Sequence, residues 1–180
     1  GLLGPQGVGA LLLDAEFAKA LCPIVTGGTG SASDSEVQPA YMPDRFESGT
    51  PNLPGIFGLH AALAFLLERG VTALRPHERA LTARLLTGVA GANVRVVGSE
   101  NGDGRVGVVA LDFCGMDNAV AAYRLESEYG VLTRCGLHCA PHAHKTLGTF
   151  PRGTVRLSIG HMTSEAEIDF AADAVMCVAG

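Results

Sequence analysis

A short stretch in the last third of the chain concentrates side chains that can act as nucleophiles and proton carriers. Two thiols and three imidazoles fall within ten consecutive residues: Cys135, His138, Cys139, His142 and His144. The whole chain has only six histidines and is 17% charged, so this is a local enrichment. The nucleophilic form of cysteine is the thiolate, which neighbouring cations stabilise. Cys139, beside His138 and near Arg134, is therefore the predicted reactive thiol.

The apolar pattern around this stretch predicts a small layered unit. In the second half of the chain, the pattern predicts strands at 94–97 and 106–113, separated by a turn at 98–104. A helix capped by Asp117 and running to residue 129, a strand at 154–159 and a helix after the Ser164/Glu167 capping box follow. This order is typical of an α+β arrangement with helices on an antiparallel or mixed sheet.

The first half of the chain has a different pattern. Apolar segments at 8–13 and 22–25 have the length of strands, and a long polar, glycine-rich stretch follows. Amphipathic spacing then predicts a helix from Pro54 to Gly70 and a second helix from Pro76 to Gly88. We place the boundary at this second helix, which gives regions 1–75 and 76–180.

Composition narrows the class of protein. The net charge of −5, with only 13 Lys and Arg, argues against a nucleic-acid partner. No apolar run reaches the ~20 residues of a membrane span, and no basic segment precedes the first apolar residues, so we expect a cytoplasmic protein. An odd number of cysteines, five, fits a reducing compartment. We expect Cys22, Cys114 and Cys177 to be small core residues.

Four motifs, in order, resemble one enzyme family. Residues 1–7, 27–31, 45–52 and 134–141 are similar to class V aminotransferases, in the branch of cysteine desulfurases and selenocysteine lyases. These are pyridoxal-phosphate enzymes of fold type I, and the resemblance extends over essentially the whole chain. It implies an α/β and α+β fold, in which 1–75 is the C-terminal portion of the large cofactor-binding domain and 76–180 is the small C-terminal domain.

The resemblance implies roles for the reactive stretch. Cys139 matches the thiol that attacks the sulfur of cofactor-bound L-cysteine, releasing L-alanine and leaving a persulfide on Cys139. Arg156 matches the arginine that binds the substrate carboxylate, which a guanidinium can hold by two parallel hydrogen bonds. Arg134 either orients the substrate or activates the thiol, and His138 either moves a proton or packs as a neutral polar residue. Cys135 is either a resolving thiol or a small-residue substitution.

Further roles concern the cofactor and partners. Thr50 matches a threonine that contacts the cofactor phosphate of the neighbouring subunit of a homodimer, and Gly49 lets the backbone approach it. The alternative is a turn that only starts the following helix. The resemblance also implies an amino-acid substrate and a sulfur-acceptor protein. For His142, His144 and Lys145 we expect structural hydrogen bonds near the mouth of the site.

The cofactor-binding lysine of the resembled family lies immediately before the segment that matches residues 1–5. This chain has two lysines, Lys19 and Lys145, and neither has that context. We therefore expect the chain to be the C-terminal half of an enzyme about twice as long, and to be inactive by itself.

Three other functions fit the residues. The first is a class V aminotransferase or lyase acting on another amino acid, in which Cys139 is dispensable. The second is a metal-binding module built from the Cys and His residues of the stretch; structural zinc sites usually combine two ligand pairs, and we find no second pair, so we assign no metal ligand. The third is a stable fragment without activity, whose unpaired strand edges favour association with a second copy.

Overall fold

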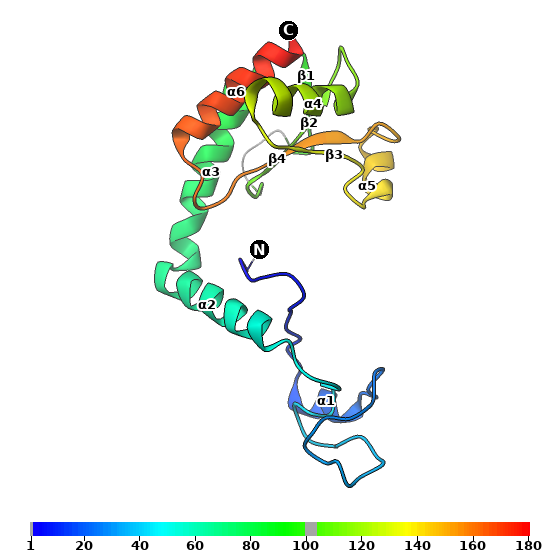
Figure 1. Ribbon diagram of the computed structural model, residues 1–180. Coiled ribbons are helices and arrows are strands. Elements are labelled where there is room, and N and C mark those ends of the chain that lie inside the picture. Colours follow the sequence, from blue (N-terminus) through cyan, green and yellow to red (C-terminus); the bar gives the residue numbers. More distant parts are fainter. Residues whose placement is uncertain (1, 100–103) are drawn as a thin grey trace. The chain divides into compact units, whose positions relative to one another are not determined.

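The computed structural model describes residues 2–99 and 104–180 and consists of two compact units, Gly1–Gly70 and Val71–Gly180 (Figure 1). The division falls at Gly70, where one helix ends and the next begins, rather than at the expected 75/76 boundary. The predicted helix start at Pro76 is wrong, because Pro76 lies inside the helix Val71–Gly88. Proline removes one backbone donor and so disfavours a helix interior, but its fixed φ is helical, and here the helix runs through it.

Unit 1 contains two helices, α1 (Ala15–Ala20) and α2 (Leu53–Arg69), joined by a long irregular segment. The predicted helix after Pro54 is confirmed. Its first turn is capped by the Asn52 side chain, which accepts a hydrogen bond from the Gly55 amide.

The predicted strands at 8–13 and 22–25 are wrong. All four strands found in residues 2–99 and 104–180 belong to unit 2, and Leu12 and Ile24 are 94% and 100% exposed. A strand needs a neighbour that takes its backbone hydrogen bonds. Local apolar composition indicates that a segment can form a strand, but it does not show whether a neighbouring strand is present to pair with it.

Unit 2 is a four-stranded antiparallel sheet with helices on one face (Figure 1). Its strands are β1 (Val94–Val97), β2 (Val108–Phe113), β3 (Arg134–Gly136) and β4 (Thr154–Ser158), in the spatial order β1-β2-β4-β3. Its helices are α3 (Val71–Gly88), α4 (Asn118–Tyr129), α5 (Pro141–Thr146) and α6 (Glu165–Ala179). The predicted strands and the caps at Asp117 and Ser164 are confirmed, whereas β3 and α5 were not predicted. Part of the predicted turn at 98–104 lies outside the described residues.

The core lies between the sheet and the helix layer. On β2, Val109, Leu111 and Phe113 alternate with more exposed neighbours, and all three pack against the buried side chains of α3, α4 and α6. The other face of the sheet carries polar and charged residues, and it is this face that positions the candidate site. No single helix within the described residues is long and apolar enough to cross a membrane.

The expectation that Cys22, Cys114 and Cys177 are core residues is wrong, because all three are exposed. Cys22 lies in the irregular segment of unit 1, and Cys114 follows the last residue of β2. Cys177 lies on α6, whose buried positions include Val175 and Val178, and 3.6 residues per turn place Cys177 on the opposite side. Apolar neighbours in the sequence did not indicate which face each thiol occupies.

Candidate active site

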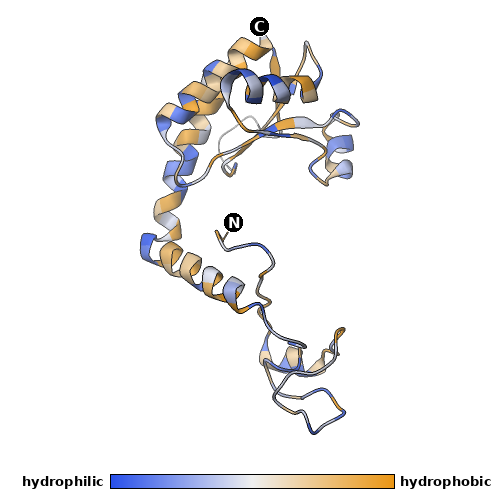
Figure 2. Ribbon diagram, in the orientation of Figure 1, coloured by the Kyte–Doolittle hydropathy of each residue, from blue (hydrophilic) through white to orange (hydrophobic). Residues whose placement is uncertain are grey.

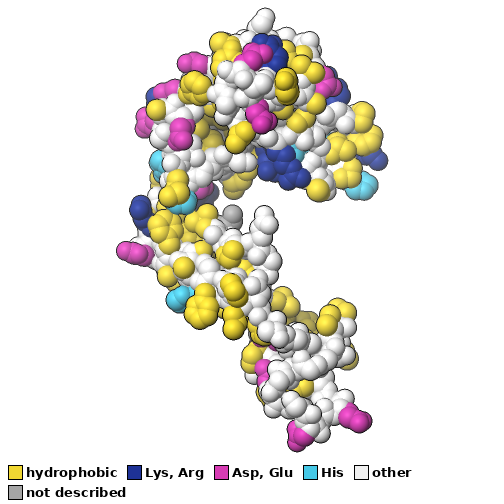
Figure 3. All heavy atoms as spheres, viewed as in Figure 1, with side chains coloured by type: hydrophobic (Ala, Val, Ile, Leu, Met, Phe, Trp, Pro, Cys, Tyr) yellow, Lys and Arg dark blue, Asp and Glu magenta, His cyan; other side chains and the backbone are white. Residues whose placement is uncertain are grey.

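Two arginines lie directly opposite each other on the open face of the sheet. The β3–β4 register pairs Arg134 with Arg156, and the next pair, Cys135 with Val155, points to the helix side. Like charges at opposed positions destabilise a sheet. Within the described residues neither arginine forms an ion pair, and the buried Arg156 Nε has no hydrogen-bond partner. Figure 3 shows basic side chains gathered on the surface beneath β3 and β4. This arrangement fits an anionic ligand.

Cys139 lies on a strained turn immediately after β3. His138 and Cys139 have φ values of 51° and 61°, the left-handed region that non-glycine residues rarely adopt. The turn is closed by the Ala140 amide, which donates to the Leu137 carbonyl at 2.8 Å, and Pro141 then begins α5. Such residues cost about 1–3 kcal/mol each and persist where the surrounding structure holds them, typically at functional sites.

The turn brings the Cys139 thiol to the arginine predicted to act with it. Arg134 Nη2 lies 3.9 Å from Cys139 Sγ, and the Cys139 side chain is exposed. A guanidinium at this distance can donate to a thiolate. The structure thus joins a reachable thiol, a cation beside it and the second arginine across the strand pair.

The His138 ring is bonded to the backbone of β3. Its Nε2 lies 2.9 Å from the Arg134 carbonyl oxygen, and because a carbonyl only accepts, this nitrogen carries the proton. Nδ1 is then the nitrogen that can accept a proton in the neutral ring. The prediction of a structural role for His144 fits its placement, since it is buried and its Nδ1 lies 2.7 Å from Thr149 Oγ1.

Cys135 differs from Cys139 in environment. It is half-buried on the helix side of β3, where burial first and the Asp117 carboxylate second raise the pKa of its thiol. A thiol held in its neutral form is a poor nucleophile. All five cysteines are free, so Cys135 and Cys139 do not form a disulfide.

Unit 1 brings together the other three motifs around Gly49 and Asn52. The Gly49 amide donates to the Gly28 carbonyl at 2.8 Å, and Asn52 Nδ2 donates to the Gly7 carbonyl at 3.2 Å. Gly49 has a φ of 89° and open space where a Cβ would be, so the backbone here is both left-handed and accessible. Thr50 follows on the exposed surface, where its hydroxyl and amide can reach a ligand.

Sequence reasoning missed Gln38, which holds this loop together. Its Nε2 lies within 3.0–3.3 Å of the Asp44 carbonyl, the Arg45 carbonyl and Ser48 Oγ, and its Oε1 accepts from the Gly27 amide. A glutamine in a polar stretch has no local pattern that distinguishes it. Only the folded loop shows which backbone groups it meets.

The metal-binding alternative gains no support from the geometry. Across residues 2–99 and 104–180, no group of three or more His, Cys, Asp or Glu side chains is placed to hold a metal ion. His138 and His144, two of the candidate ligands, are bonded instead to the Arg134 carbonyl and the Thr149 hydroxyl.

Comparison with known proteins identifies the family. The model of the family Aminotransferase class-V matches residues 2–170. The chain belongs to this family. Among curated proteins, it is 32% identical over 172 residues to a probable cysteine desulfurase of Pyrococcus abyssi, covering 94% of this chain.

Solved structures of cysteine desulfurases have the same fold. A cysteine desulfurase, CsdA, from Escherichia coli matches 98% of this chain with a TM-score of 0.82 and 28% identity. The apo structure of a cysteine desulfurase from Thermococcus onnurineus NA1 matches 96% with a TM-score of 0.83 and 30% identity. The predicted fold, part of a fold type I pyridoxal-phosphate enzyme, is therefore confirmed. The chain spans 42% of the Pyrococcus relative and 43% of each solved chain.

Proposed function

We propose that the polypeptide carrying these 180 residues is a pyridoxal-phosphate-dependent cysteine desulfurase, which converts L-cysteine to L-alanine and leaves a persulfide on Cys139. The observation that carries the proposal is the placement of Arg134 Nη2 3.9 Å from the exposed Cys139 thiol. Arg156 lies opposite Arg134 with an unpartnered buried nitrogen among the described residues, which supports binding of a carboxylate nearby. Similarity to proteins named cysteine desulfurases supports the same reaction.

The residues of unit 1 fit the phosphate of the cofactor. The open backbone at Gly49 and the exposed hydroxyl and amide of Thr50 would hold a phosphate oxygen. When bound, pyridoxal phosphate supplies an electron sink for the reacting amino acid.

We also propose a homodimer, in which Thr50 serves the partner's cofactor. Hydrophobic residues run along α2 (Figure 2), and Ile56, Phe57 and Leu67 are exposed on it. Their exposure favours burial of this helix against a second subunit.

The residues of unit 2 would carry the sulfur transfer. Arg156 binds the substrate carboxylate and so orients the amino acid. The Cys139 thiolate, with Arg134 beside it, attacks the substrate sulfur. A sulfur–sulfur bond forms, the carbon–sulfur bond breaks, and its electron pair remains with the substrate carbon, which takes up a proton to give alanine. The persulfide on Cys139 is then open to a sulfur-acceptor protein, because Cys139 is exposed.

The test is Cys139→Ala in the full-length protein loaded with cofactor. We expect sulfide release from L-cysteine, measured with a thiol reductant present, to fall by about 10²-fold or more, because the attacking atom is lost. Cys177→Ala, which removes another exposed thiol, is the control and should leave turnover unchanged. Unchanged sulfide release by Cys139→Ala would reject the persulfide on Cys139, and absence of sulfide release by the wild type would favour an aminotransferase or lyase acting on another amino acid.

A further inference from the structure

The Cys139 turn and α5 belong to one excursion of the chain between β3 and β4, residues 137–152. The excursion is closed at its base, where the backbones of Gly136 and Gly153 touch: a Cβ on Gly153 would overlap the Gly136 carbonyl group. Everything beyond this neck must be held in place by other contacts. The position of Cys139 therefore depends on what ties the excursion to the sheet.

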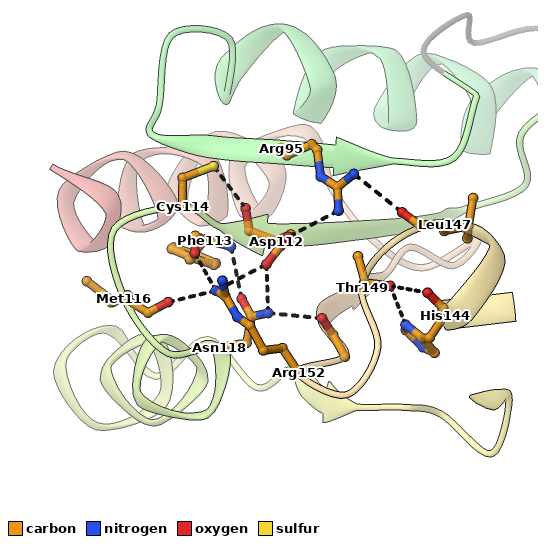
Figure 4. Close-up of polar contacts among 11 residues, drawn as sticks. Arg95, Asp112, Phe113, Cys114, Met116, Asn118, His144, Leu147, Thr149 and Arg152 are labelled. Carbon is orange, nitrogen blue, oxygen red and sulfur yellow. Dashed lines mark hydrogen bonds and ion pairs between the residues drawn. The ribbon is translucent and has the colours of Figure 1, made fainter. Parts of the chain in front are cut away.

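Asp112, on β2, is the centre of those contacts (Figure 4). Its side chain is only 14% exposed and meets three donors: Asn118 Nδ2 at 3.0 Å, Arg95 Nη2 at 3.2 Å and Arg152 Nη2 at 3.3 Å. Two guanidinium groups so close together would repel each other without the carboxylate. Asp112 therefore makes the cluster possible.

The donors held by Asp112 bind the excursion directly. Arg95 Nη1 donates to the carbonyl of Leu147, the C-cap residue that follows α5, at 3.4 Å. Asn118 Nδ2 donates to the carbonyl of Gly153, at the neck, at 3.0 Å. Arg152 is itself part of the excursion. One carboxylate thus organises contacts at both the neck and the far end of the segment.

The excursion is internally braced, so that its far end and Cys139 are connected. Thr149 Oγ1 lies 2.7 Å from His144 Nδ1, the Thr149 amide donates to the His144 carbonyl at 2.9 Å, and Lys145 Nζ lies 5.1 Å from the centre of the Phe150 ring (Figure 4 shows the first pair). α5 is only six residues long, and Cys139 lies two residues before its first residue. A shift at Leu147 is therefore carried through one short helix to the turn.

We propose that Asp112 is a positioning residue for Cys139, acting through Arg95, Asn118 and Arg152 to hold the excursion in the geometry that sulfur transfer requires. The kinetic part of this inference rests on the proposed function; the structural part does not. None of these four residues belongs to the four motifs that indicate the family.

The test is Asp112→Asn in the full-length protein loaded with cofactor, a change that keeps the shape of the side chain and removes its charge. We expect amide hydrogen exchange in peptides covering 137–153 to accelerate by about tenfold, with peptides of α6 unchanged. Single-turnover persulfide formation on Cys139 should slow by about tenfold while the KM for L-cysteine stays within about twofold, since misplacing the nucleophile impairs reaction more than binding. A loss of overall stability alone would not accelerate exchange at 137–153 while leaving α6 unchanged, and it would not slow persulfide formation at a nearly constant KM.

The matched control is Asp169→Asn, which breaks an arginine–carboxylate pair with Arg84 on the same unit, away from the excursion. It should change neither measurement. Arg95→Ala, at a side chain 48% exposed, removes the contact to Leu147 and should act in the same direction if Asp112→Asn does not fold. Unchanged exchange at 137–153, or faster exchange with an unchanged persulfide rate, would overturn the proposal. If Asp112→Asn accelerates exchange at 137–153 but the wild type forms no persulfide, the proposed function is rejected and the structural part of the inference stands.

Discussion

Arg134 and Arg156 place two positive charges on neighbouring strands, and within the described residues no carboxylate pairs with either of them. Four other arginines in the described part of unit 2 do have carboxylate partners, as Arg84 does with Asp169 and Arg124 with Glu128. This difference at the residue scale supports our proposal that Arg134 and Arg156 bind an anion.

Arg156→Lys tests the hypothesis that Arg156 binds the substrate carboxylate. Lysine keeps the charge but cannot form the two parallel hydrogen bonds of a guanidinium, so we expect the KM for L-cysteine to rise by about tenfold or more in steady-state assays. Arg124→Lys, which alters an exposed pair on α4, should leave the KM unchanged. A KM for Arg156→Lys equal to that of the wild type would show that Arg156 does not bind the carboxylate.

At the scale of the element, α6 begins with a complete capping box. The Glu167 amide donates to Ser164 Oγ at 3.3 Å, and the Glu167 carboxylate accepts from the Ser164 amide at 2.7 Å. Hydrogen bonds from the Ser164 backbone and side chain lower the pKa of Glu167. The ionised form is therefore favoured by folding, and the cap stabilises a helix that covers the sheet.

The capping box makes a pH-dependent prediction. Since the pKa of Glu167 is lower in the folded state, its stabilisation is present above its ordinary pKa and is lost as the pH falls through the lowered value. We would measure the free energy of unfolding by denaturant titration from about pH 7 to about pH 2. It should be higher for the wild type than for Glu167→Gln at the upper end of this range and equal for both at the lower end. The control is Asp173→Asn, at an exposed position later in α6. Its free energy of unfolding should differ from that of the wild type by the same amount at every pH. A constant difference at all pH values would contradict the ionic role of Glu167.

At the scale of the whole molecule, the two units differ in how much core they contain. Of the buried hydrophobic residues in the described chain, only Ala18 lies in unit 1, and the continuous core belongs to unit 2. A sheet with one face covered by three packed helices has what independent folding needs. Unit 1 instead leaves the apolar residues of α2 exposed.

We therefore expect residues 71–180, produced alone, to unfold in one cooperative transition. Leu85→Ala, at a fully buried position of α3, should lower the free energy of unfolding by about 2–5 kcal/mol through lost burial and a cavity. Val120→Ala, at an exposed position of α4, should change it by less than about 0.5 kcal/mol. Thermal unfolding followed by circular dichroism measures both, and a broad transition insensitive to Leu85→Ala would contradict an independent unit.

The sequence by itself determined what depends on near neighbours. The caps at Asp117 and Ser164, the amphipathic spacing after Pro54 and the apolar run of β2 are local signals, and the structure confirms the elements that they predict. The order of four short motifs was enough to indicate the family, because motif residues are recognisable without knowledge of their contacts.

Only the tertiary structure decided what depends on distant partners. The segments at 8–13 and 22–25 have the composition of strands, but strand formation requires a neighbour. The sequence left open whether Cys135 is a second working thiol. Strand pairing directs Cys135 to the helix side, while the turn presents Cys139 to solvent beside Arg134. Asp112 has no local signature at all. Its three donors come from separate elements and meet only when the sheet forms, because contacts over long sequence separations are set by pairing and packing rather than by local propensity.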